Sequence, residues 1–86
     1  MDIFGLLGLR GTRKILEELG ERGSVRYSDL VKAVGFSTTT TRALKGMEQL
    51  GVVKKRVLDE PYRPVEYSLT DRGKKVLAIV KELKEL

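Results

Sequence analysis

Residues 24–57 read SVRYSDLVKAVGFSTTTTRALKGMEQLGVVKKRV, and two helical patterns lie close together within this stretch. The first is SDLVKAVG at residues 28–35, which ends in a glycine, and the second runs from about 38 to 50. Two helices joined by a tight turn that contains glycine are typical of a helix-turn-helix unit. We therefore predict such a unit, with Ser28 and Ser37 as the N-caps of its two helices.

The second predicted helix has two unlike sides. Thr40, Leu44 and Met47 recur at helical spacing, so this side is expected to face the core. The opposite side is polar and basic, and it carries no carboxylate before Glu48. Its outward residues are predicted to be Thr38, Thr39, Thr41, Arg42, Lys45 and Gln49.

Four threonines, Thr38–Thr41, stand in a row at the start of this helix. Threonine is a middling-to-poor helix former, so helix stability does not explain the run. One explanation is a capping cluster, which we accept for Ser37 and for the inward-facing Thr40. For Thr38, Thr39 and Thr41 we predict contacts with DNA, because a threonine hydroxyl can bond to a base or a phosphate and its methyl group can touch thymine.

Two strand patterns follow the second helix. Apolar and polar residues alternate over 53–57 and 65–69, and DEPYRP between them carries both prolines of the chain. Prolines fit the tip of a hairpin better than a strand, so we predict a two-stranded ribbon, or wing. The alternation sends Lys54 and Arg56 to one face of the ribbon and Lys55 to the other.

The tip of the ribbon has mixed charge. Arg63 could reach a minor groove or a phosphate with Tyr62 bracing it, whereas Asp59 and Glu60 would repel phosphates. On the second predicted helix, Arg42 is the best candidate for bidentate contact with guanine, and Lys45 is the best candidate for contact with a phosphate. The predicted DNA-binding residues are Ser37, Thr38, Thr39, Thr41, Arg42, Lys45, Lys54, Arg56 and Arg63.

Further helices are predicted on both sides of this region. TRKILEELGERG should form one with Thr12 as its N-cap, followed by a brief extended segment, SVRY. The last helix should span about 70–86 with Thr70 as its N-cap. Its apolar residues cover about half of its surface, which is more than one small core requires. Four of them follow the 3-4-3 spacing of a coiled-coil seam: Val76, Ile79, Leu83 and Leu86.

Both ends of the chain are rich in apolar residues. The segment at about 2–10 is too apolar to lie free in water, and a chain of 86 residues has little interior left for it. We therefore predict a single winged-helix domain over 1–86 whose two ends form the interface of a homodimer. The predicted interface residues are Ile3, Phe4, Leu6, Leu7, Val76, Ile79, Val80, Leu83 and Leu86.

The composition narrows the classes of function. Net charge is +5, from 17 Lys and Arg against 12 Asp and Glu, which fits either a mildly basic surface or a polyanionic partner. Histidine and cysteine are absent, which removes the commonest general base, thiolate metal ligands and disulfides. We predict no enzymatic activity, no cofactor and no metal site.

No stretch of the sequence is long and apolar enough to predict a membrane span. The first residues, MDIFGLLGLRG, lack a basic region and a cleavage site, so we interpret them as part of the fold and expect a cytoplasmic protein. Asparagine is absent while lysine and glutamate are abundant, a composition like that of thermophile proteins.

Three fragments of the chain resemble HxlR-type transcriptional regulators. RYSDLVKAV resembles their R-[FY]-S-[DE]-L motif, LKGMEQLGVVKKRV their exit from the recognition helix, and PVEYSLTDRGKKVL their V-E-Y-S-L-T-x-x-G. The resemblance covers residues 6–83, and MarR-, ArsR- and TrmB-like regulators share looser versions of the pattern. It implies a winged helix-turn-helix fold, mostly α with a small β-hairpin wing.

The chain departs from the HxlR pattern in two places. Many HxlR-type proteins carry a redox-sensing cysteine near the N-terminus, and this chain has none. Their wing commonly reads P-P-R-V-E-Y, whereas here Arg63 precedes Pro64.

These observations predict a transcriptional regulator that binds double-stranded DNA as a homodimer, with the helix at about 37–50 in the major groove. A winged helix that serves only as a protein-interaction module is the alternative. Such a module usually lacks a concentrated basic face on its recognition helix, and this feature separates the two hypotheses. The sequence does not reveal whether an effector ligand binds.

Overall fold

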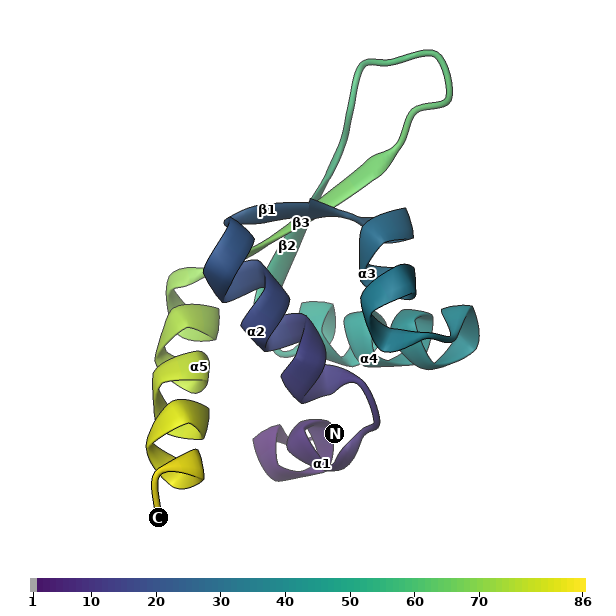
Figure 1. Cartoon of the computed structure of the whole chain (residues 1–86). Coiled ribbons are helices and arrows are strands. Elements are labelled where there is room, and N and C mark those ends of the chain that lie inside the picture. Colours follow the sequence, from purple (N-terminus) through teal and green to yellow (C-terminus); the bar gives the residue numbers. More distant parts are fainter. Residues whose placement is uncertain (1) are drawn as a thin grey trace.

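The computed structural model of the protein describes residues 2–86. Within this range, helices flank a small antiparallel sheet, and a long hairpin extends away from the helices (Figure 1). The elements are α1 (Ile3–Gly8), α2 (Thr12–Arg22), β1 (Ser24–Arg26), α3 (Tyr27–Val34), α4 (Ser37–Gln49), β2 (Val53–Val57), β3 (Val65–Leu69) and α5 (Asp71–Lys84). The predicted fold, mostly helical with a β-hairpin wing, is confirmed.

Helices α3 and α4 form the predicted helix-turn-helix. Gly35 ends α3 in the left-handed region with φ of 102°, which glycine adopts without the steric cost of a Cβ. Phe36 then returns to an extended backbone, and α4 begins at the next residue and crosses below α3 in Figure 1. Thr40, Leu44 and Met47 are buried, as their spacing predicted.

Three predicted N-caps are wrong by one or two residues. Thr12 and Ser37 are the first residues inside α2 and α4, and Ser28 is the second residue of α3. In α4 the reason is visible: the backbone N–H of Thr40 donates to the carbonyl of Phe36 at 3.0 Å, so the helix already begins at Ser37. No side chain caps these three helices.

The wing is part of a three-stranded sheet rather than the predicted two-stranded ribbon. The strand order is β1-β3-β2, and both pairs are antiparallel. Gly23 ends α2, and the short segment that follows pairs with β3, where Val25 lies opposite Tyr67. This pairing buries Val25, and it explains why so short an extended segment is ordered.

The N-terminal segment forms a helix that packs on its own chain. Leu6 is fully buried in the core, and Ile3, Leu7 and Leu9 pack partly buried against it. The expectation that the core has no room for this segment is therefore wrong, because α1 lies against α2 and α4 and closes one end of the core. The largest fully buried side chains are Leu6, Ile15, Leu16, Leu19, Leu30, Leu44, Met47, Val25, Val52, Thr12 and Thr40.

The start of α5 joins the wing to the core. Thr70 is its N-cap, as predicted, and its hydroxyl accepts from the backbone N–H of Gly73 at 3.1 Å. The proton of this hydroxyl is shared between the carbonyls of Gly51 and Val52, and the N–H of Thr70 donates to the carbonyl of Val52 at 3.0 Å. Gly73 lies so close to Val52 that a Cβ at this position would overlap the carbonyl oxygen of Val52.

We therefore expect Gly73→Ala to destabilise the protein by about 1–3 kcal/mol or more, the usual cost of forcing extra volume into a packed site. The obstacle is backbone, which cannot move aside as a flexible side chain can, and the shift would also disturb the Thr70 cap. Denaturant unfolding measures the effect. Gly8→Ala is the matched control, because a Cβ there meets nothing within 4 Å. Equal midpoints for the two variants would contradict this account of Gly73.

Candidate nucleic-acid interface

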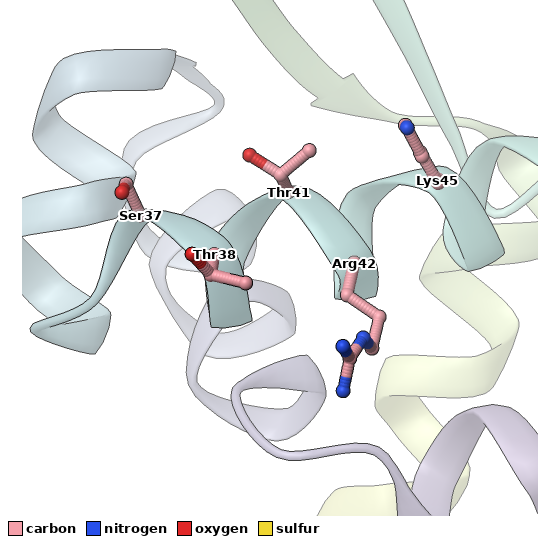
Figure 2. Close-up of a pocket in the computed structure, with 5 residues that line it drawn as sticks. All are labelled: Ser37, Thr38, Thr41, Arg42 and Lys45. Atoms are coloured by element: carbon pink, nitrogen blue, oxygen red, sulfur yellow. The ribbon is translucent and has the colours of Figure 1, made fainter.

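The exposed side of α4 carries five polar or basic residues around a shallow depression of about 370 Å³. Figure 2 shows Thr38 and Arg42 pointing to one side of the helix and Thr41 and Lys45 to the other, as positions four residues apart do. The lining residues are Ser37, Thr38, Thr41, Arg42 and Lys45. All five are among the residues that the sequence predicted for DNA binding.

The charge of this surface is uncompensated. Arg42 and Lys45 are exposed, and among residues 2–86 neither forms an ion pair. The first turn of α4 holds no acidic residue, and no side chain caps its free N–H groups. The N-terminus of a helix carries a partial positive charge, so the start of α4 and the two cationic side chains together favour the binding of an anion.

The four threonines have different environments. Thr40 is fully buried, and its hydroxyl donates to the carbonyl of Phe36 at 2.7 Å, as expected for an inward-facing residue. Thr39 is half-buried and lines a separate groove of about 270 Å³ between α4 and α2. A Cβ on Gly11 would lie 3.4 Å from its methyl carbon. Thr39 therefore does not share the depression with Thr38 and Thr41.

Thr41 has a partner that the sequence analysis missed. Its hydroxyl lies 2.7 Å from the phenol oxygen of Tyr27, which is the first residue of α3. Tyr27 is partly buried against the core, so it joins the exposed side of α4 to the interior of the domain. The sequence shows a tyrosine at the start of the first helix of the pair, but no local pattern indicates that it reaches one threonine of the next helix.

The basic residues of the wing do not share one surface. Lys54 lies opposite Ser68 and lines a hollow with Gly20, Lys74 and Leu77, next to α2 and α5. Lys55 lies opposite Tyr67 and forms an ion pair of 3.9 Å with Glu48 of α4. The alternation predicted for these residues is thus observed, and Lys54 lies apart from the depression on α4.

An ion pair ties the acidic tip of the wing to β1. The guanidinium of Arg26 contacts both carboxylate oxygens of Glu60, at 3.0 and 2.9 Å. A bidentate pair of this kind has a fixed geometry, and it neutralises Glu60, one of the two carboxylates that were expected to repel phosphates; Asp59 is exposed. Arg63 is exposed at the tip in the left-handed region, with φ of 45°, and Tyr62 beside it is 95% exposed.

The predicted interface residues divide into buried and exposed groups. Leu6, Val76 and Val80 belong to the core of their own chain, so they offer little surface to a partner. Ile79 and Leu83 are 55% and 57% exposed on α5. Phe4 and Leu86 are also exposed, and Ile3 and Leu7 are half-buried.

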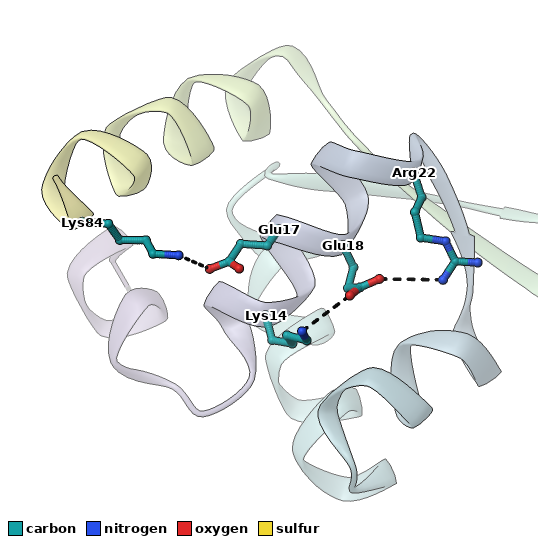
Figure 3. Close-up of polar contacts among 5 residues, drawn as sticks. All are labelled: Lys14, Glu17, Glu18, Arg22 and Lys84. Carbon is teal, nitrogen blue, oxygen red and sulfur yellow. Dashed lines mark hydrogen bonds and ion pairs between the residues drawn. The ribbon is translucent and has the colours of Figure 1, made fainter.

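Helices α1 and α5 lie next to each other at the end of the molecule opposite the wing (Figure 1). Leu7, Val80 and Leu83 line a notch of about 290 Å³ between them. Lys84 donates to Glu17 of α2 at 3.1 Å, which holds the end of α5 against the domain (Figure 3). This hydrogen bond keeps the pKa of Glu17 below its usual value.

Other kinds of site find no support in the described part of the chain. Within residues 2–86, no group of acidic side chains is arranged to hold a metal ion. None of the helices described there is long and apolar enough to cross a membrane. Burial raises the pKa of Tyr67 in β3, with the nearby charge of Glu48 adding to the effect.

Comparison with known proteins agrees with this geometry. The family model of the HxlR-like helix-turn-helix matches residues 6–86. The uncharacterized HTH-type transcriptional regulator YdzF of Bacillus subtilis is 31% identical over 80 residues, which cover 91% of this chain and 73% of YdzF. A second uncharacterized HTH-type transcriptional regulator, from Halalkalibacterium halodurans, is 34% identical over 82 residues, which cover 93% of this chain and 73% of that protein.

Two solved structures have the same fold. The reduced form of the transcriptional regulator YodB from B. subtilis superposes with a TM-score of 0.81 at 28% identity, covering 95% of this chain and 81% of YodB. The putative transcriptional regulator YtfH from Salmonella typhimurium gives a TM-score of 0.85 at 28% identity, covering 96% and 75% of the two chains. The protein with the basic, threonine-rich α4 therefore belongs to the HxlR-like helix-turn-helix family.

Proposed function

We propose that the protein is a cytoplasmic transcriptional regulator that binds double-stranded DNA as a homodimer, with the N-terminal half of α4 in the major groove. One observation carries the proposal: Arg42 and Lys45 are exposed around one depression on α4 with three hydroxyl residues, and among residues 2–86 neither of them forms an ion pair. The relatives YdzF and YodB are described as transcriptional regulators, and the family is one of DNA-binding regulators rather than enzymes.

The side chains of α4 suit a helix that approaches DNA closely. Ser37 and Thr38 are small and exposed, so the start of the helix can approach the base edges and a phosphate can reach its free N–H groups. Arg42, one turn further on, has the planar guanidinium that pairs with guanine O6 and N7. Lys45 is a flexible point charge and suits a phosphate. Arg63 at the tip of the wing would add a backbone contact.

The exposed apolar residues of α5 support a dimer. Ile79 and Leu83 lie one turn apart and are more than half exposed, and Phe4 of α1 is 80% exposed. An isologous interface brings the same patch of two copies together, and a two-fold axis would place two recognition helices about 34 Å apart, one turn of DNA. The contribution of α1 to this interface would come from Phe4 and the half-buried Ile3 and Leu7, since Leu6 is in the core.

Substitutions in α4 should separate base contacts from phosphate contacts. We expect Arg42→Ala to cost about 1–3 kcal/mol of binding free energy at a preferred duplex and to relax base preference at one position in each half-site. Lys45→Ala should weaken binding to all duplexes by a similar factor, because a phosphate contact carries no sequence information. Duplexes selected from a random library by the unmodified protein, followed by fluorescence anisotropy with each variant, provide both measurements.

Arg72→Ala is the charge-matched control, because Arg72 is exposed at the start of α5 and away from the depression on α4. It should leave base preference unchanged. If Arg42→Ala changes neither affinity nor preference, the proposed orientation of α4 is wrong. If the unmodified protein binds no duplex at low salt, the winged helix acts as a protein-interaction module instead.

A further inference from the structure

The hydroxyl of Thr41 is held in an unusual way for a threonine inside a helix. Such a hydroxyl commonly bonds back to the carbonyl four residues earlier, and Thr40 does this with Phe36 at 2.7 Å. For Thr41 the corresponding carbonyl belongs to Ser37, but among the described residues the hydroxyl of Thr41 bonds to Tyr27 instead. The phenol oxygen of Tyr27 lies 2.7 Å from Thr41 Oγ1 and 3.5 Å from the carbonyl oxygen of Ser37.

The two distances favour one direction for the hydrogen bond between Tyr27 and Thr41. A phenol is a more acidic hydroxyl than an alcohol, so it is the better donor of the two. Its second acceptor, the carbonyl of Ser37, is at the limit of a hydrogen bond, whereas 2.7 Å is the ordinary length of a strong O–H···O bond. Either oxygen can donate in this hydrogen bond, and the two distances favour the phenol of Tyr27 as the donor to Thr41 Oγ1. With that direction, the hydroxyl proton of Thr41 is free for a second partner.

Thr41 itself lines the depression on α4. Thr41 borders this depression together with Arg42 and Lys45, and it is half-buried while they are exposed. Tyr27 therefore holds Oγ1 of a residue that lines the depression on α4. A fixed donor discriminates between partners, while a freely rotating hydroxyl can donate or accept as required.

We propose that Tyr27 is a positioning residue that makes Thr41 a hydrogen-bond donor to a base edge in the major groove, so that Thr41 selects an acceptor such as guanine O6 or N7, adenine N7 or thymine O4. The inference rests on the proposed function, because it requires α4 to meet DNA. It adds a residue of α3 to the set that determines sequence preference, although the phenol of Tyr27 itself need not touch DNA.

Tyr27→Phe tests this role, because the variant keeps the ring in the core and removes only the hydroxyl. Loss of one hydrogen bond should weaken binding to the selected duplex about 2–10-fold and relax base preference at a single position in each half-site. Thr41→Val, which keeps the shape and removes the hydroxyl, should relax the same position. Adding Tyr27→Phe to Thr41→Val should then have no further effect on DNA binding.

Tyr67→Phe is the matched control, because Tyr67 is a buried tyrosine of β3 and the hydroxyl of Thr41 bonds to Tyr27 instead. It should leave base preference unchanged. The proposal is overturned if Tyr27→Phe weakens binding to all duplexes equally or leaves base preference intact. It is also overturned if Tyr27→Phe has the same effect on DNA binding in the Thr41→Val variant as in the unmodified protein. In each of these outcomes the unmodified protein still selects a duplex, whereas a protein that selects none refutes the proposed function as well.

Discussion

Raising NaCl from 50 to 200 mM is expected to weaken duplex binding by about 10³–10⁵-fold. Each phosphate neutralised by Lys or Arg releases condensed counterions, and the entropy of that release falls as bulk salt rises. A dimer that uses about 6–10 such contacts should give a slope of roughly −5 to −9 in a plot of log K against log salt. The exposed Lys45 and Arg63 of each protomer, together with the free N–H groups at the start of α4, are the principal candidates.

Anisotropy titrations of one duplex at four or five NaCl concentrations measure this slope. Lys45→Ala should make it shallower by roughly 2, one contact for each protomer of the dimer, while Arg72→Ala should leave it unchanged. A slope near zero would show that the basic side of α4 does not bind phosphates, and it would favour the protein-interaction alternative.

Replacing both Ile79 and Leu83 with glutamate is expected to convert the dimer to monomers and to weaken binding to a palindromic duplex by about 10²–10⁴-fold, the usual advantage of two linked sites. Two carboxylates on this part of α5 would have to be desolvated when the interface forms. The free energy of that desolvation is unfavourable, and the favourable burial of two apolar side chains is lost as well. Because both side chains are more than half exposed in the single chain, the substitutions should not disturb its core.

Sedimentation velocity at tens of micromolar reports the oligomeric state, and a half-site duplex reports the affinity of one domain. The matched control is Ala78→Glu with Lys81→Gln, which changes the net charge by the same amount at exposed positions on another side of α5. This control should remain dimeric. If the unmodified protein sediments as a monomer, the exposed face of α5 is not a dimer interface and the proposed two-fold arrangement is wrong.

The order of the elements from α2 to α5 follows from local patterns in the sequence. Apolar residues at helical spacing, Gly35 between two helices and the prolines of the wing each depend on the backbone geometry of a few neighbouring residues. The same reasoning identified Thr38, Arg42 and Lys45 as outward residues of α4, because the period of a helix determines which residues face away from the core. The cap formed by Thr70 was also predictable, because its hydroxyl bonds to a residue only three positions further along the chain.

What the sequence did not reveal depends on contacts between distant residues. Leu6 fills the core and Thr39 packs toward α2 because of how helices cross, which no periodicity encodes. Tyr27 meets Thr41, and Arg26 meets Glu60, across separations of 14 and 34 residues. Local spacing thus determines which residues a helix presents, but only the packing of one element on another decides which of them are left free, because a side chain's partner is set by proximity in space rather than along the chain.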